Sequence, residues 1–141
     1  MIAIDSDPAR LDMDVIHGFL ANTYWSRGIA RDLLEKALRH SLCFGVYEDD
    51  RQVGFARVVT DQATFAYLAD VFILESHRGQ GLAKKLVAAI AADSRLQGLR
   101  RWVLVTRDAH PLYAQFGFKP LAAADRFMEL HDPDVYSARR K

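Results

Sequence analysis

The feature that most constrains the fold of this chain is a strand that runs through a glycine-containing turn directly into a helix. Apolar residues over 64–74 predict the strand, residues 77–81 the turn, and periodic apolar residues a helix over 82–94. The first amides of such a helix lie at the positive end of its dipole without intrahelical partners, which suits a phosphate. A tight strand-to-helix connection without a ligand explains the turn equally well, because a third glycine and a P-loop pattern are both absent.

The remaining elements predict a mixed α/β fold around this unit. Strands are expected at residues 2–4, at a sheet edge, and at 42–47, 52–59, 102–106 and 126–130. Helices are expected at 14–20, 30–40 and 111–116. The polar turn at 48–51 predicts an antiparallel hairpin. The strand, helix, strand unit over 65–106 predicts a parallel pair.

Length and composition limit the classes of function that fit. A length of 141 residues fits one domain, and 50% hydrophobic with 26% charged residues is typical of a globular protein. A formal net charge of +1 provides no broad positive field, so we expect neither a nucleic-acid partner nor a membrane partner. The absence of a signal-like segment and of an apolar run near ~20 residues predicts a soluble, cytoplasmic protein.

Cysteine and histidine usage argues against two kinds of site. The lone Cys43 excludes an intrachain disulfide and fits a reducing compartment. It lies on a predicted strand away from the glycine turn, which speaks against an acyl-cysteine route. The five histidines and Cys43 do not fall at metal-ligand spacing, so we expect no metal.

Two motifs, which follow one another along the chain, together carry a resemblance to a known family. Arg78-x-x-Gly81-x-Ala83 resembles the R/Q-x-x-G-x-G/A pyrophosphate loop of the GNAT (GCN5-related N-acetyltransferase) superfamily, and Tyr113-x-x-x-Gly117-Phe118 resembles a downstream segment of that family. The resemblance covers nearly the whole chain, 1–141, as a single N-acetyltransferase domain. It implies a mixed, mostly antiparallel central sheet of six to seven strands with a splayed parallel pair, flanked by about four helices.

The resemblance also implies acetyl-CoA as cosubstrate, held between the splayed strands. Backbone groups of Val71 and Ile73, with Phe72 between them, are expected to bind the pantetheine arm as a pseudo-strand. The turn is expected to wrap the pyrophosphate, mainly through main-chain amides, with a side-chain charge from the last of its residues: Arg78, Gly79, Gln80, Gly81, Leu82, Ala83 and Lys84. His77 is expected on the solvated surface.

Tyr113 and Asp70 are the candidate catalytic residues. Tyr113 falls where the family usually places the acid that protonates the CoA thiolate, and a phenol is protonated at neutral pH. The alternative is a ring that only packs on Phe116 or Phe118. Many relatives use a glutamate as general base where this chain has Ala69. Asp70 reaches that side of the sheet only if a bulge re-aims it; otherwise it orders a loop or pairs with Arg57, and water carries the proton.

The acceptor site is expected between the first two helices and the neighbouring strand. Tyr24 and Trp25 are candidates to pack on the acceptor, although both rings equally fit the core beneath the second helix. Arg57 and Asp61 are candidates from the strand region, with Asp61 favouring a cationic amine. The predicted function is acetyl transfer from acetyl-CoA to a primary amine of a small molecule or peptide by direct attack in a ternary complex. The alternative is a noncatalytic acyl-CoA-binding or regulatory domain, and a homodimer through C-terminal sheet edges fits either.

Overall fold

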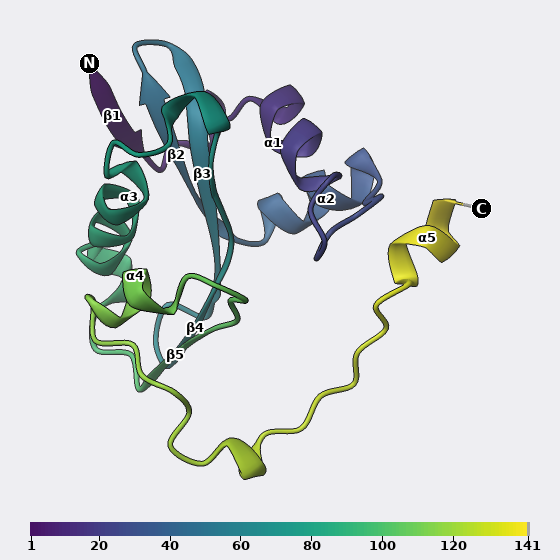
Figure 1. Cartoon of the computed structure of the whole chain (residues 1–141), viewed down its shortest axis with the longest axis vertical. Coiled ribbons are helices and arrows are strands. Elements are labelled where there is room, and N and C mark those ends of the chain that lie inside the picture. Colours follow the sequence, from purple (N-terminus) through teal and green to yellow (C-terminus); the bar gives the residue numbers. More distant parts are fainter. Residues whose placement is uncertain (141) are drawn as a thin grey trace.

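The computed structural model of the protein describes residues 1–140, with side chains described through Ser137. Five strands of the described chain form one sheet in the order β1-β2-β3-β4-β5 (Figure 1). Neighbours are antiparallel except β4 and β5, which are parallel. The strands are β1 (Ile2–Asp5), β2 (Leu42–Glu48), β3 (Arg51–Thr60), β4 (Phe65–Ile73) and β5 (Arg101–Leu104).

Helices cover both faces of this sheet, with α1 and α2 on one side and α3 on the other (Figure 1). The Asp12 carboxylate caps α1 by accepting hydrogen bonds from the amides of Asp14 and Val15, which fixes where that helix begins. The α-helices are α1 (Met13–Leu20), α2 (Arg31–Arg39), α3 (Leu82–Ala91), α4 (His110–Ala114) and α5 (Val135–Arg140). Among the described residues, no helix is both long and apolar enough to cross a membrane.

The sheet separates two apolar clusters. The cluster on the α3 side includes Val58, Leu68 and Leu86, and the cluster on the α1–α2 side includes Phe55 and Phe72. Alternate residues of each strand therefore enter opposite clusters, as the period of two predicts. Phe19 of α1 stacks on Phe72 with ring centroids 4.0 Å apart, which fixes α1 over the carboxyl end of β4.

A β-bulge interrupts this alternation in β4. Ala69 pairs with Arg57, but Phe72 pairs with Phe55, so β4 contains one more residue than β3 between these two pairs. Asp70 lies at the bulge with a backbone φ of 58°, a left-handed conformation that Asp tolerates better than most residues. The bulge turns the Asp70 side chain to the α1–α2 side of the sheet, as its candidate role requires.

Most predicted elements are confirmed: the edge strand, the hairpin of β2 and β3, and the parallel pair all form. The predicted sheet of six to seven strands is wrong, since the described chain forms five, and five α-helices replace the expected four. The strand expected at 126–130 is absent: a short 3₁₀ turn, Ala124–Arg126, leads into extended chain without strand partners. Alternating apolar residues make a strand only when a neighbouring strand accepts their backbone hydrogen bonds.

Candidate active site

A cavity of about 460 Å³ opens where β4 and β5 stop pairing. The two strands pair over residues 65–68 and 101–104, and β4 then continues to Ile73 without β5 beside it. One edge of β4 therefore has backbone groups without a neighbouring strand, which agrees with the splayed parallel pair that the family resemblance implies. Of the predicted cofactor residues, those that line the cavity are Val71, Phe72, Ile73, Arg78, Gly79, Gly81, Leu82 and Ala83, whereas Gln80 and Lys84 lie on the same turn and helix but outside its walls.

The turn before α3 presents free amides to this cavity. Gly79 and Gly81 adopt φ values of 79° and 74°, which glycine tolerates without strain, and no side chain caps α3 at Gly81. Within the part of the chain that the structure describes, the amides of residues 79–84 donate no hydrogen bond to a protein acceptor. The Arg78 guanidinium bends back so that its Nε donates to the Ile73 carbonyl, 3.1 Å away. Donors and positive charge thus meet at one end of the cavity, which fits a diphosphate.

His77 corrects one expectation, because it is buried rather than solvated. Its Nε2 lies 3.3 Å from a Glu48 carboxylate oxygen at the end of β2, and its Nδ1 lies 2.7 Å from the Ser76 hydroxyl. The contact with Glu48 connects the glycine turn to the end of β2. A histidine beside a glycine-rich turn gave no sign of this in the sequence, because Glu48 is 29 positions away.

Tyr113 of α4 forms part of the cavity wall and is only 8% exposed. Its ring packs edge-on against Phe118 with centroids 6.0 Å apart, which is a contact that both the packing and the catalytic interpretations of this residue allow. The same ring also faces the cavity, and no hydrogen bond to its hydroxyl is made by the described residues. Burial raises the pKa of the Tyr113 phenol above its ordinary value, which keeps the proton on the oxygen at neutral pH.

Asp70 lies beside the cavity at the centre of a hydrogen-bonded group. Its side chain is 6% exposed, one oxygen accepts from Trp25 Nε1 at 2.8 Å, and the other accepts from Arg57 Nε at 2.7 Å. Arg57 also donates to the Ser41 hydroxyl at 3.3 Å. The pairing with Arg57 is the structural alternative that the sequence left open for Asp70. Both oxygens are therefore engaged by donors, and the carboxylate fixes the Trp25 indole.

The aromatic pair of the α1–α2 loop lies at the surface rather than in the core. Tyr24 is 55% exposed and Trp25 43% exposed, and both line the cavity. The two rings meet edge to face with centroids 5.0 Å apart. The Arg107 guanidinium lies 3.8 Å from the Tyr24 ring centroid, so the segment after β5 contacts the α1–α2 loop. Sequence reasoning missed Arg107, since no local pattern connects it to a residue 83 positions earlier.

Asp61 does not join this group. Its carboxylate lies in the turn between β3 and β4 and accepts hydrogen bonds from the amides of Ala63, Thr64 and Phe65 and from the Thr64 hydroxyl. These bonds hold the pKa of Asp61 far below its usual range. The structure therefore gives the Asp61 carboxylate a local role in its own turn, away from the cavity walls.

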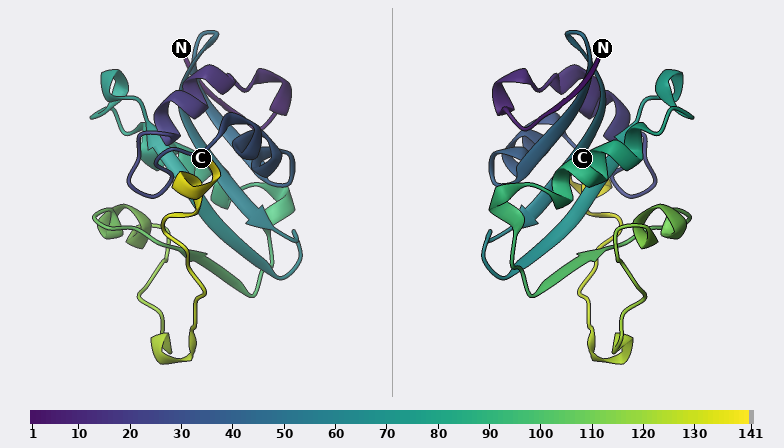
Figure 2. Two further views of the ribbon diagram at one scale, coloured as in Figure 1. Left: turned by 90° about the vertical axis from the view of Figure 1, so that its right-hand side faces the viewer. Right: turned by 90° about the vertical axis from the view of Figure 1, so that its left-hand side faces the viewer.

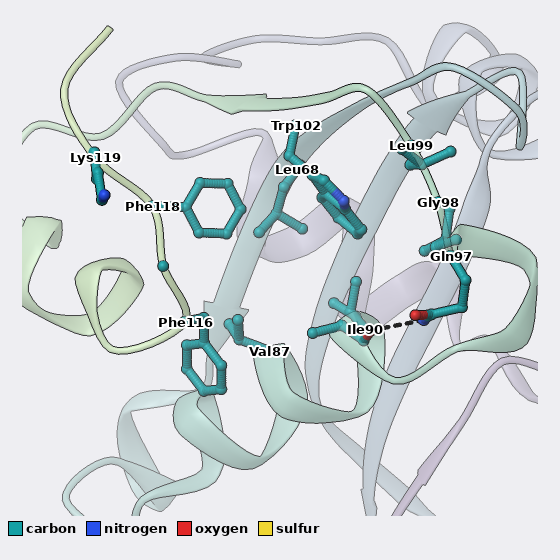
Figure 3. A pocket seen from close by; sticks show the side chains of 13 residues that line it. Leu68, Val87, Ile90, Gln97, Gly98, Leu99, Trp102, Phe116, Phe118 and Lys119 are labelled. Carbon is teal, nitrogen blue, oxygen red and sulfur yellow. Dashed lines mark hydrogen bonds between the residues drawn. The ribbon is translucent and has the colours of Figure 1, made fainter. Parts of the chain in front are cut away.

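A second cavity of about 400 Å³ lies on the α3 side of the sheet, between α3, β5 and the segment after α4 (Figure 3). Trp102, Phe116 and Phe118 line it, and Lys119 is its one titratable residue among those described. Among the described residues, its walls have neither a tyrosine hydroxyl nor the free amides of the glycine turn before α3, both of which line the cavity at the strand splay. The described residues contain no group of three or more metal-ligating side chains. Cys43 is buried, and burial raises the pKa of its thiol to about 11.

Comparisons with known proteins agree with this geometry. The profile of the acetyltransferase (GNAT) domain family matches residues 39–120, more than half of the chain. The chain belongs to the GNAT acetyltransferase family. A GNAT-family crystal structure from Xanthomonas campestris pv. campestris, described as a candidate acetyltransferase, is 48% identical, covers 97% of each chain and has a TM-score of 0.95.

Two further relatives extend the comparison. A curated protein of Gibberella zeae, named as a candidate acetyltransferase, is 34% identical over 135 residues, which is 79% of this chain and 75% of that protein. A GNAT acetyltransferase of Elizabethkingia anophelis, solved with acetyl-CoA bound, shares 14% identity with a TM-score of 0.66 over 91% of this chain and 86% of that one. That likeness concerns the fold. The protein is an acetyltransferase of a family that uses acetyl-CoA.

Proposed function

We propose that this GNAT protein transfers the acetyl group of acetyl-CoA to a primary amine of a small molecule or peptide, by direct attack in a ternary complex. The observation that supports this most strongly is that an amide-rich turn, an exposed aromatic pair and Tyr113 all line one cavity. Buried Cys43, whose thiol pKa is raised to about 11, lies outside that cavity and does not serve as a covalent acetyl carrier.

The free amides and the open edge of β4 fit acetyl-CoA, which supplies an activated acetyl thioester when bound. The amides of residues 79–84, with the Arg78 and Lys84 side chains, bind the diphosphate. Backbone groups of Val71 and Ile73 hold the pantetheine amides along β4, and Phe72 anchors this segment in the core. An amide of the same segment, near Val71 or Phe72, polarises the thioester carbonyl.

Tyr113 donates the proton that the departing thiolate takes up. Its raised pKa keeps the phenol protonated through neutral pH, and its packing on Phe118 fixes the direction of the hydroxyl. Glycine at 117 allows the sharp end of this segment, with φ of 92°, so that Phe118 folds back onto the Tyr113 ring.

Asp70 holds residues on the acceptor side of the cavity in place and does not accept the proton of the amine. Its two oxygens hold Trp25 and Arg57, and Trp25 is the ring that borders the cavity. With alanine at position 69, the proton of the attacking amine leaves through water. The exposed Tyr24 and Trp25 rings contact the acceptor, since aromatic faces attract a cationic amine and its apolar neighbours.

Thiol release tests this function. Purified protein is incubated with acetyl-CoA and a panel of amines: polyamines, aminoglycosides, and peptides that carry lysine or a free N-terminus. We expect release of CoA that depends on at least one acceptor. Binding of CoA without acceptor-dependent release across the panel would favour the noncatalytic alternative.

Tyr113→Phe tests the proton donor, because it keeps the ring that packs on Phe118 and removes only the hydroxyl. We expect kcat to fall by about 10²-fold or more at unchanged CoA affinity. The matched control is Tyr136→Phe, which removes a hydroxyl from a tyrosine outside the cavity walls and leaves turnover unchanged. Wild-type kcat in Tyr113→Phe would remove Tyr113 from the mechanism.

A further inference from the structure

The cavity at the strand splay offers no carboxylate to a ligand. None of the described residues that line it is Asp or Glu, whereas Arg78 is among them. Asp70 lies beside the cavity, but its two oxygens accept hydrogen bonds from Trp25 and Arg57, and the Arg57 guanidinium balances its charge. An acceptor with several positive charges therefore finds no available counter-charge in these walls.

Arg107 adds a positive charge where Tyr24 lines this cavity. Its guanidinium carbon lies 3.8 Å from the centroid of the Tyr24 ring. Arg107 is exposed, and it makes no ion pair or hydrogen bond with a described residue. Because a guanidinium that packs on an aromatic ring keeps its N–H groups at its rim, these donors are available to a ligand.

The turn between β5 and α4 holds Arg107 in this position. The Ala109 amide donates to the Thr106 hydroxyl at 3.0 Å, and Ala109 itself lines the cavity. Tyr113, on the helix that follows, is also part of the cavity wall. In both views of Figure 2 this segment lies beside the loop between α1 and α2. One short segment of the chain thus supplies the unpaired guanidinium and the phenol beside the same cavity.

We propose that Arg107 binds an oxyanion of the acceptor, so that the substrates are small amines that also carry a carboxylate or a phosphate group. This inference rests on the proposed function, because it concerns the acceptor of that transfer. The planar fork of guanidinium donors matches the paired oxygens of either anion. The Tyr24 ring, beneath the guanidinium, and the Trp25 ring contact the carbon skeleton between the anion and the amine.

Arg107 also disfavours acceptors with several positive charges. Its guanidinium occupies one face of the Tyr24 ring, and that face is then closed to an ammonium group of the acceptor. Like charges brought together in a binding site also cost binding free energy. We therefore expect polyamines and aminoglycosides to be poor acceptors, and amino acids or amino phosphates to be good ones.

Matched pairs of acceptors that differ in one group test this in the thiol-release assay. One arm compares leucine with leucinamide and phenylalanine with phenylalaninamide, and the other compares phosphoethanolamine with ethanolamine. We expect kcat/KM for the anionic member of at least one pair to exceed that of its partner by about 10- to 100-fold, and that pair identifies the anion as carboxylate or phosphate. The amine of a carboxamide loses its proton more readily, so a preference for the amino acid comes from the site.

Substitutions of Arg107 test whether this residue causes the preference. Arg107→Gln should lower kcat/KM for the anionic acceptor by about 10- to 100-fold and leave its uncharged partner and the dissociation constant of CoA unchanged. Arg107→Lys should keep part of the preference, because an ammonium group keeps the charge and loses the planar fork. Arg107→Glu should favour a diamine such as putrescine instead. The matched control, Arg100→Gln, removes the same charge from an exposed arginine just before β5 and should leave the preference unchanged.

Several results would overturn the proposal. They are acetylation only of amines without an oxyanion, a preference that survives in Arg107→Gln, and weaker CoA binding by Arg107→Gln, which would assign Arg107 to the phosphates of the cofactor. If no acceptor supports thiol release, the proposed function fails, and calorimetric titration of the same anionic compounds into CoA-saturated protein decides the oxyanion site. Binding to the wild type that Arg107→Gln loses supports the site, whereas equal binding to both proteins, or binding to neither, overturns it.

Discussion

Asp70→Asn separates a positioning carboxylate from a proton-accepting one. Asparagine keeps an oxygen for Trp25 Nε1 and tolerates the left-handed backbone, φ 58°, so the substitution removes charge rather than changing the chain path. Arg57 then loses the anionic partner at 2.7 Å. Loss of one partner of a buried ion pair costs about 3–5 kcal/mol. Because Arg57 is 20% exposed and keeps Ser41 as an acceptor, we expect about 2 kcal/mol of unfolding free energy to be lost.

Urea unfolding and steady-state kinetics measure the two consequences separately. A double-mutant cycle of Asp70→Asn with Arg57→Gln should give a coupling free energy of at least about 1 kcal/mol. In kinetics, we expect the KM of the acceptor to rise while kcat changes by less than about 10-fold. Trp25→Phe should produce a larger rise in KM without the loss of stability, because it removes the N–H donor altogether, keeps a ring and leaves the Asp70–Arg57 pair in place.

Two results would refute this reasoning. A coupling free energy below about 0.5 kcal/mol would show that the ion pair does not stabilise the fold. A fall in kcat of about 10²-fold or more, together with loss of the acidic limb of the pH–rate profile, would show that Asp70 accepts the proton.

Three further predictions concern groups outside the cavity. Tyr47→Phe should raise the unfolding free energy by about 1 kcal/mol in urea titrations, because the Tyr47 hydroxyl is buried without a partner among the described residues. Cys43 should resist a thiol reagent near pH 8 in the folded protein and react in urea, since burial raises its pKa to about 11. Asp61→Ala should lower the melting temperature at neutral pH. Because folding lowers the pKa of Asp61, its contribution is present above the unfolded value of 3.8 and declines as the pH falls below it, so melting curves of the two proteins should converge in acid.

The strands and helices near the cavity could be predicted because their signals are local. Alternation in β2 and β3, and the apolar face of α3, each depend on residues a few positions apart. The segment 126–130 has the same alternation but forms no strand, since the outcome depends on whether a neighbouring edge is within reach. The strand-forming pattern is visible in the sequence, but the distance to a strand that could pair with it is not.

The sequence predicted the backbone groups of the candidate site better than its side-chain contacts. The free amides of the turn follow from glycines at 79 and 81, which are visible in the sequence. Side-chain contacts between distant segments were not visible. The direction of Asp70 depends on a bulge, the burial of His77 on Glu48, and the contact on Tyr24 on Arg107. The His77 and Tyr24 contacts require partners 29 and 83 positions away, and the direction of Asp70 requires a change of one residue in register. None of these leaves a periodic signal in the sequence.

The bulge at Asp70 affects both the open edge of β4 and the Trp25 ring. β4 pairs with β5 only as far as Leu68, and the bulge follows two residues later, where added twist turns the rest of β4 away from β5. A non-glycine residue in the left-handed region costs roughly 1–2 kcal/mol, and hydrogen bonds from Arg57 and Trp25 offset that cost. The contacts that hold β4 open, where we propose that the pantetheine arm binds, are thus the same ones that fix the Trp25 ring, which we propose contacts the acceptor. A substitution that breaks both contacts, such as Asp70→Ala, should therefore weaken CoA binding as well as acceptor binding, whereas Trp25→Phe should weaken acceptor binding alone.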